Sequence, residues 1–375
     1  MELSIYFLLF GVLSCYVYGA QSSQNFTSIF SFGDSYTDTG NFPTLAAAAG
    51  WPISFTSIYP PYGETFFHQP AGRWSDGRLI IDFIAKEYGL PYIPPYKAYT
   101  GSFNQGANFA VGGATAINVE FFEKNGYVKF NMIRDSLDYQ LAWFEELKAT
   151  LCASTEECKE FFSTSLFTFG EFGANDYSFM LEAGVSVNEV RTYVPQVVQL
   201  ISAAVEQVIS AGAVTLAVAG QLPTGCIPII LTLFQSSNSD DYEANTGCLT
   251  AYNNLAMYHN VLLRQELMRL RSKYPHVKLS YTNYYDPIIN IVKSPCLPGK
   301  YCFIDKPLQV CCGKDGPYNY NLTELCGMPG VDACQTPSTY LHWDGVHLTE
   351  AAYHYISDTW LHGPFADPPI KGPRN

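Results

Sequence analysis

The sequence predicts an α/β fold with a parallel sheet, formed as a single domain. The first observation is that short apolar runs alternate with long amphipathic segments, which is typical of consecutive βαβ units. The second is that no internal repeat, low-complexity stretch or block of charge divides the 375 residues. The third is that the motifs with reactive side chains follow apolar runs, and open α/β sheets bind ligands at the carboxyl ends of their strands.

Five apolar runs have the length and composition of buried strands. They cover residues 28–32, 106–111, 166–169, 214–218 and 277–281. Four longer segments carry apolar residues at helical spacing, and these cover residues 134–151, 190–210, 250–274 and 349–361. Gly212 and Pro275 end the second and third of these helices.

The charge of the chain excludes one class of partner. The chain has 21 basic and 34 acidic residues, a formal charge of −13 at pH 7, and no basic cluster. Nucleic-acid binding depends on clustered basic side chains, so nucleic acid is not expected as a partner. The acidity favours solubility without identifying a substrate.

The first twenty residues have the features of a secretory signal peptide. Residues 3–12 are apolar, and the small residues Gly19 and Ala20 precede Gln21. The apolar run is too short for a membrane span, and no later stretch of about 20 apolar residues occurs. We therefore expect a soluble secreted protein with no membrane span. The Pro-rich tail, residues 363–375, carries no retention signal.

Ten cysteines remain once the leader with Cys15 is removed, and an even number in a secreted chain predicts disulfides. Cys152 and Cys158 are close enough to close a small loop, and Cys226 and Cys248 bracket a polar excursion. The pairing of the remaining six, which lie in a Pro/Gly-rich excursion around residues 296–334, stays open: Cys296, Cys302, Cys311, Cys312, Cys326 and Cys334. A zinc cluster is the alternative, but no pair of Cys-x-x-Cys arms occurs there.

Two sequons fit the same secreted compartment. They are Asn25-Phe26-Thr27 and Asn321-Leu322-Thr323. They predict glycosylation of Asn25 and Asn321.

A serine, a histidine and an aspartate form the candidate site. Ser35 follows Gly33 and Asp34 at the end of the first predicted strand, and far downstream Asp344 and His347 are three residues apart. A serine hydroxyl is a poor nucleophile until a neighbouring base takes its proton, and an acid must orient that base. We predict Ser35 as the nucleophile, His347 as the base and Asp344 as the acid.

Each assignment has an alternative. A serine at this place could instead be a turn or helix-cap residue, so Ser35 depends on the other motifs for its role. His342 is a rival to His347, because it also lies next to the acid in sequence. Asp34 and Asp38 are interpreted as turn residues that shape the nucleophile loop.

Two further motifs supply hydrogen-bond donors for an oxyanion. One is the glycine-rich turn 108–114, and the other is the segment 173–176, which contains Asn175. We predict an oxyanion hole made of the Ser35 backbone N–H, a glycine backbone N–H and the Asn175 side chain. Gly113 is preferred for the glycine, although Gly112 stays open, and glycine suits a backbone that approaches a substrate closely.

The order and spacing of these four motifs resemble the GDSL esterase/lipase family of the SGNH-hydrolase superfamily, in its plant secreted branch. The resemblance runs from Ser31 to Leu361 and includes residues 61–64, residues 72–78 and Trp343 before the acid. The chain has no Gly-x-Ser-x-Gly elbow, which distinguishes it from conventional α/β-hydrolases.

The resemblance implies a three-layer α/β/α, flavodoxin-like fold with a five-stranded parallel sheet. Residues 21–362 would form one hydrolase domain with the disulfide-rich excursion, between a signal peptide at 1–20 and the tail 363–375. It implies catalysis by Ser35, Asp344 and His347 without a cofactor or metal, on a small-molecule ester, in the apoplast or the vacuole. The oligomeric state is not predicted.

The resemblance also suggests a substrate class. Residues 61–85 and 109–116 are similar to esterases of specialised metabolites such as acetylajmalan esterase and sinapine esterase. This implies an acetyl, other short-chain or aromatic acyl ester of an alkaloid, glucoside or choline-like alcohol. The alternatives are an acyltransferase that passes the acyl group to an alcohol, and a catalytically idle binding protein. A lipase for long acyl chains is a further alternative, but no apolar lid with glycine hinges occurs.

Overall fold

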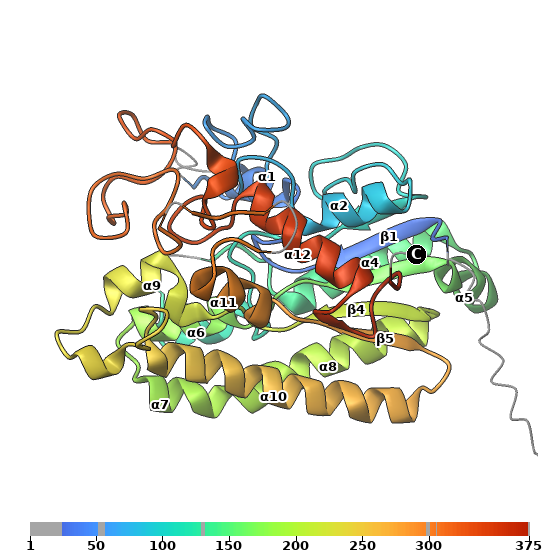
Figure 1. Ribbon diagram of the computed structural model, residues 1–375. Helices are drawn as coiled ribbons and strands as arrows, with labels where there is room; N and C mark the ends of the chain where they lie inside the picture. The colour runs from blue at the N-terminus through green and yellow to red at the C-terminus, as the bar shows by residue number, and fades with distance from the viewer. Residues whose placement is uncertain (1–24, 52–56, 129–131, 298–300, 305, 374–375) are drawn as a thin grey trace, which may run out of the picture.

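The computed structural model of the chain describes residues 25–51, 57–128, 132–297, 301–304 and 306–373, so the expected leader at 1–20 lies outside it. Within these residues one sheet has the order β2-β1-β3-β4-β5-β6 (Figure 1). Its strands are β1 (Ser28–Phe32), β2 (Gly106–Asn108), β3 (Ser165–Phe169), β4 (Thr215–Ala219), β5 (Lys278–Thr282) and β6 (Ala366–Asp367). Neighbours from β2 to β5 are parallel, and β6 is antiparallel to β5. The order β2-β1-β3-β4-β5 is the flavodoxin-like order.

Strand side chains alternate between two cores, one on each face of the sheet. On β1, Phe30 and Phe32 belong to one core and Ile29 to the other. On β4, Leu216 belongs to the first core and Ala217 to the second. Successive side chains of a strand point to opposite faces, so the sheet is buried on both sides, as expected for a parallel sheet.

Helices cover both faces. The helices are α1 (Asn41–Ala48), α2 (Ile80–Glu87), α3 (Val119–Lys124), α4 (Leu137–Leu151), α5 (Thr155–Ser163), α6 (Ala174–Glu182), α7 (Val187–Val190), α8 (Val194–Ala211), α9 (Pro228–Leu233), α10 (Thr250–Lys273), α11 (Tyr285–Lys293) and α12 (Glu350–His362). α4, α5, α8 and α10 contribute to the first core, and α2, α9, α11 and α12 to the second. Figure 1 shows α2 and α12 above the sheet and α8 and α10 below it. The predicted three-layer fold is confirmed.

The predicted helix at 190–210 is divided in the structure. α7 ends at Val190, a short 3₁₀ turn follows, and α8 begins at Val194. Pro195 lies in the first turn of α8. Proline has no N–H to donate and is tolerated only in the first turn of a helix, so it sets the start of α8.

Within the described residues the sheet has six strands, one more than the five predicted. After α12 the chain turns back, and residues 366–367 pair with β5 as β6. The Asn283 N–H donates to the Phe365 carbonyl (2.9 Å) and the Ile370 N–H to the Trp360 carbonyl (2.9 Å). A two-residue strand is too short to leave an alternating pattern in the sequence, so periodicity could not predict it.

One helical stretch of the described residues, Val187–Ala211, is long and apolar enough to cross a membrane by length and composition alone. Half of its most apolar window is buried within the molecule. Val194, Val197 and Val205 belong to the core beneath the sheet. Burial against the sheet therefore accounts for its composition.

Ten cysteines form five disulfides, including the two pairs suggested by the sequence. The pairs are Cys152–Cys158, Cys226–Cys248, Cys296–Cys302, Cys311–Cys334 and Cys312–Cys326. The last two anchor the excursion to the segment before Asp344. The Cys311 N–H donates to the His342 carbonyl (3.0 Å), and the Cys312 N–H donates to the Trp343 carbonyl (2.7 Å).

Replacing both Cys312 and Cys326 by serine should lower stability and the expected hydrolase activity together. The disulfide closes a separation of 14 residues, and its loss should lower the free energy of unfolding by about 3 kcal/mol. Activity should fall because the Cys312 N–H holds the Trp343 carbonyl directly before Asp344, the predicted catalytic acid. Urea unfolding followed by circular dichroism, with ester hydrolysis rates, measures both effects.

The matched control replaces Cys152 and Cys158, which lie six residues apart and whose hydrogen bonds within the described residues are all local to α4 and α5. It should lower the free energy of unfolding by about 2 kcal/mol and leave the turnover rate of the folded protein unchanged. Equal losses of turnover in the two variants would contradict the expectation that the Cys312 backbone holds the segment before Asp344 in place.

Candidate active site

Ser35 lies in a tight turn at the carboxyl end of β1. The Asp34 carbonyl accepts hydrogen bonds from the Thr37 N–H (3.0 Å) and the Asp38 N–H (2.9 Å). The Asp34 side chain accepts from the Tyr36 N–H (2.9 Å). Ser35 is 7% exposed, and within the described part of the chain neither its N–H nor its hydroxyl has a hydrogen-bond partner. Both groups are therefore free to meet a substrate.

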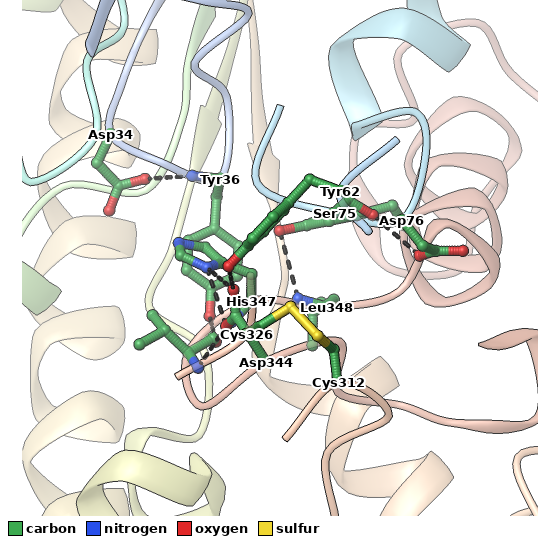
Figure 2. Close-up of polar contacts among 12 residues, drawn as sticks. Asp34, Tyr36, Tyr62, Ser75, Asp76, Cys312, Cys326, Asp344, His347 and Leu348 are labelled. Atoms are coloured by element: carbon green, nitrogen blue, oxygen red, sulfur yellow. Dashed lines mark hydrogen bonds and ion pairs between the residues drawn. A yellow bond between two sulfur atoms is a disulfide. The ribbon is translucent and has the colours of Figure 1, made fainter. Parts of the chain in front are cut away.

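Asp344 and His347 form a buried pair in the loop before α12 (Figure 2). The His347 Nδ1 lies 2.8 Å from Oδ2 and 3.0 Å from Oδ1 of Asp344. Oδ1 also accepts the backbone N–H groups of Val346 and His347, both at 2.7 Å. With Nδ1 directed at the carboxylate, Nε2 is the nitrogen left to accept a proton, and it has no partner among the described residues.

Two aromatic residues bring the serine turn and the histidine loop together. The Tyr36 ring lies 5.6 Å from the His347 ring, and its hydroxyl donates to the Val346 carbonyl (2.6 Å). Trp74 also stacks on the imidazole, with ring centroids 5.0 Å apart. Because Tyr36 follows Ser35 directly, these contacts fix the histidine beside the nucleophile turn.

His342, the rival base, does not share this arrangement. Its side chain is fully buried, and neither ring nitrogen has a partner within the described ranges. Burial lowers the pKa of His342 to about 3, although the nearby charge of Asp344 acts in the opposite direction. Among the described residues, the one imidazole that hydrogen-bonds to the Asp344 carboxylate is that of His347. The geometry favours His347.

The charge of Asp344 is stabilised in the folded protein. Burial alone would raise the pKa of this carboxyl group. The charge of His347 and hydrogen bonds from His347 and Val346 outweigh burial and lower the pKa to about 2. Asp344 therefore stays ionised and acts as an acceptor for the imidazole.

The two candidate glycines of the glycine-rich turn 108–114, Gly112 and Gly113, have different environments. The Gly112 N–H donates to the Asp38 carboxylate (2.9 Å), and a Cβ on Gly112 would meet the Trp74 indole at 2.9 Å. The Gly113 N–H has no partner among the described residues. Gly113 has φ +87°, and a Cβ there would meet nothing within 4 Å. The open donor is therefore Gly113, the preferred candidate.

Asn175 lies in the first turn of α6 and faces the same region. Its Nδ2 donates to the Asp34 carboxylate (3.0 Å) and to the Ala114 carbonyl (3.0 Å). Both amide hydrogens thus have acceptors, which the sequence did not predict. These two hydrogen bonds orient the amide between the nucleophile turn and the glycine-rich turn.

Two buried carboxylates hold the glycine-rich turn. Asp38 binds the Gly112 N–H, and Asp176 accepts the N–H groups of Ala116 (2.9 Å) and Ile117 (2.8 Å). Burial raises the pKa of Asp38 to about 6 and that of Asp176 to about 7, against these hydrogen bonds. Asp38 also accepts backbone N–H groups at the start of α1. It therefore links the nucleophile loop, which it was predicted to shape, to the glycine-rich turn.

A further carboxyl pair lies behind Asn175. Asp34 and Glu171 are both buried, and the nearby charge of Asp34 adds to burial in raising the pKa of Glu171. Burial raises the pKa of Asp34 to about 7 and raises that of Glu171 well above its ordinary value. Glu171 also accepts from the Ala174 N–H (2.9 Å) and the Gln221 amide. The pair supports the start of α6, where Asn175 lies.

The sequence analysis did not identify the supporting residues of the site. Tyr36 and Trp74 contact the imidazole, and Asp176 and Glu171 hold the oxyanion region. Asp176 lies in the motif 173–176, and Trp74 lies in residues 72–78, which are part of the family resemblance, but neither was given a role. Nothing in the pattern distinguishes Tyr36 from the other aromatic residues, which form 15% of the chain.

Comparison with known proteins places the chain in a family. The model of the family described as GDSL-like Lipase/Acylhydrolase matches residues 29–360. The chain belongs to this family. The GDSL esterase/lipase At1g28600 of Arabidopsis thaliana is 44% identical over 369 residues, or 98% of this chain and 92% of that protein. The Arabidopsis GDSL esterase/lipase At2g27360 is 45% identical over 93% of this chain and 87% of its own length.

Family membership confirms the resemblance seen in the sequence, and the chain is a carboxylic-ester hydrolase. The described residues contain no group of three His, Cys, Asp or Glu side chains arranged to hold a metal ion. Among the sequon residues, Asn25 is exposed. The Asn321 amide donates to the Lys314 carbonyl (2.7 Å) and the Glu324 carboxylate (3.3 Å).

Replacing Asn175 by alanine should lower kcat by about 10²–10³. The side chain is the predicted donor to the oxyanion, and its hydrogen bonds to Asp34 and Ala114 hold the two turns together. Steady-state hydrolysis of a chromogenic ester measures the effect. The matched control is Asn118→Ala, because Asn118 only caps α3 and bonds Asp138 on the surface. Unchanged kcat in a folded Asn175→Ala protein would exclude Asn175 from the oxyanion site.

Replacing Asp344 by asparagine should lower stability in a pH-dependent way. A carboxyl group whose pKa is lowered by folding stabilises the protein above its unfolded value, and this contribution is lost as pH falls through the folded value. With the pKa of Asp344 near 2, the variant should be less stable by about 2 kcal/mol at pH 6. The difference should shrink between about pH 4 and pH 2. Urea titrations at several pH values test this, and a difference independent of pH would contradict it.

Proposed function

We propose that this chain is a secreted esterase that works through an acyl intermediate on Ser35. The observation that carries the proposal is the orientation of His347, whose Nδ1 is bound to Asp344 while Nε2 is buried and unpaired within the described ranges. The nucleophile turn adjoins this imidazole through Tyr36. An oriented base beside a serine hydroxyl is the arrangement that acyl transfer requires.

In the first half-reaction, His347 Nε2 takes the Ser35 proton as Oγ attacks the ester carbonyl carbon. The carbonyl oxygen becomes an oxyanion, and donors already aimed at it lower the barrier. Collapse of this intermediate breaks the bond to the alcohol oxygen, and His347 returns its proton to the leaving alcohol. In the second half-reaction His347 Nε2 takes a proton from water as the water oxygen attacks the acyl carbon. Collapse of this second intermediate breaks the bond between the acyl carbon and Ser35 Oγ, and His347 returns its proton to Oγ as the acid leaves.

The oxyanion donors in this proposal are the Ser35 N–H, the Gly113 N–H and the Asn175 amide. The two backbone donors are unpaired in the described part of the chain, so no existing bond must break when the oxyanion forms. Asp344 stays ionised and stabilises the imidazolium. The steps as written use only these side chains and water.

For the substrate, we propose an acetyl or other short-chain or aromatic acyl ester of a plant specialised metabolite, such as an alkaloid or glucoside. The similarity of residues 61–85 and 109–116 to esterases of that kind supports it. For the compartment, we propose secretion to the apoplast or vacuole. Five disulfides and the exposed sequon residue Asn25 support an oxidising, glycosylating route.

The test compares wild-type and Ser35→Ala protein on a panel of acetyl, longer-acyl and aromatic-acyl esters, including acetylated alkaloids, with methanol present. We expect hydrolysis by the wild type, with a loss of about 10⁶-fold in kcat in the alanine variant. The preferred ester identifies the substrate class. Circular dichroism of both proteins controls for folding.

Three outcomes would contradict the proposal. Hydrolysis retained by Ser35→Ala would mean that another nucleophile acts. Methyl esters in excess over free acid would make the chain an acyltransferase. No turnover of any ester by a folded wild type would favour a binding protein.

A further inference from the structure

Asp344 accepts a hydrogen bond from a residue far away in the chain. The Tyr62 hydroxyl donates to Asp344 Oδ2 at 2.8 Å. Tyr62 is only 3% exposed, so it lies beneath the surface that a substrate can reach. Figure 2 shows its hydroxyl directed at the Asp344–His347 pair.

The bond completes the set of donors to the carboxylate. Oδ1 accepts the Val346 and His347 backbone N–H groups, and both of these donors belong to the same short loop. Oδ2 accepts the His347 Nδ1–H and the Tyr62 hydroxyl, both at 2.8 Å. Among the described residues, Tyr62 is the one donor to this carboxylate from outside residues 344–347.

The Tyr62 ring is held on several sides. It packs edge-on against Trp74 and Trp343, with centroids 6.1 Å and 6.0 Å apart. The same buried cluster contains the disulfide Cys312–Cys326. Trp74 also stacks on the His347 imidazole. The hydroxyl is therefore fixed before any substrate arrives, which is what a group that orients catalytic residues requires.

We propose that Tyr62 is a positioning residue of the active site, which fixes the rotation of the Asp344 carboxylate and shares the charge of Oδ2 with His347. This inference rests on the proposed roles of Ser35, His347 and Asp344. Without the hydroxyl, the carboxylate could rotate about its side-chain bond, and the imidazole would lose its alignment with Ser35.

The hydroxyl remains a donor throughout the working pH range, because burial raises the pKa of Tyr62 well above its ordinary value. The titratable groups that act on Asp344 from the surrounding segments are Tyr36, Tyr62, Tyr320, His342, His347 and Tyr353. Of these, only Tyr62 and His347 hydrogen-bond to its carboxylate within the described residues.

The test replaces Tyr62 by phenylalanine, which removes one oxygen and keeps the packed ring. We expect kcat to fall about tenfold with KM unchanged, because a charge-assisted hydrogen bond is lost at a group that does not touch substrate. We also expect the acidic limb of the kcat/KM profile to move up by about 0.5 pH units. The reason is that Oδ2, with its charge no longer shared, stabilises the imidazolium more strongly.

The matched control is Tyr36→Phe. The Tyr36 hydroxyl bonds the Val346 carbonyl in the same loop but does not touch the carboxylate. This variant should leave the acidic limb where it is, even if the looser loop lowers kcat. A double-mutant cycle adds Tyr62→Phe to Asp344→Asn, where it should change kcat by less than about twofold.

Wild-type kcat and an unmoved acidic limb in folded Tyr62→Phe protein would overturn the inference. An equal shift of the limb in Tyr36→Phe would also overturn it, since loop placement would then explain both effects. An undiminished effect in the Asp344→Asn background would show that Tyr62 does not act through the carboxylate. If the proposed roles of Ser35, His347 and Asp344 were wrong, the Ser35→Ala variant would retain activity, which is a separate measurement.

Discussion

The buried carboxylate of Asp344 is the constraint on which the rest of the site depends. A carboxylate removed from water is unfavourable unless several donors replace its hydration. Here the donors are two backbone N–H groups, the His347 imidazole and the Tyr62 hydroxyl. Tyr62 is separated from Asp344 by 282 residues, so the carboxylate is satisfied only after distant parts of the chain have packed together. The catalytic pair and the tertiary structure therefore form together.

In the predicted oxyanion region, some backbone N–H groups are bound by buried carboxylates, and others have no partner among the described residues. Asp38 and Asp176 bind the backbone N–H groups that set the course of the glycine-rich turn. These bonds leave the N–H groups of Ser35 and Gly113 without partners in the described part of the chain. Donors that are fixed but unpaired stabilise a developing charge with little reorganisation. Asp38 and Asp176 therefore fix the backbone that carries the Ser35 and Gly113 N–H groups, although they do not hydrogen-bond to these two groups.

Much of the fold, and the residues that the structure brings together in the candidate site, could be predicted from the sequence, because both leave local patterns. The buried strand at 28–32 has the predicted bounds, and Ser35 follows it directly. What could not be predicted depends on contacts between distant segments. The hydrogen bond from Tyr62 to Asp344 has no local signal, since the chain contains 27 tyrosines. The pairing of Cys311, Cys312, Cys326 and Cys334 and the acceptors of the Asn175 amide are likewise set by tertiary packing.

The central claim is that Ser35 is the nucleophile activated by His347. The most direct test is intact-mass analysis and peptide mapping after incubation of wild-type, Ser35→Ala and His347→Ala proteins with a fluorophosphonate probe. The account predicts one adduct on the wild-type protein, located at Ser35, no adduct on Ser35→Ala, and much slower labelling of His347→Ala. An adduct on another residue, or labelling of His347→Ala at the wild-type rate, would contradict it.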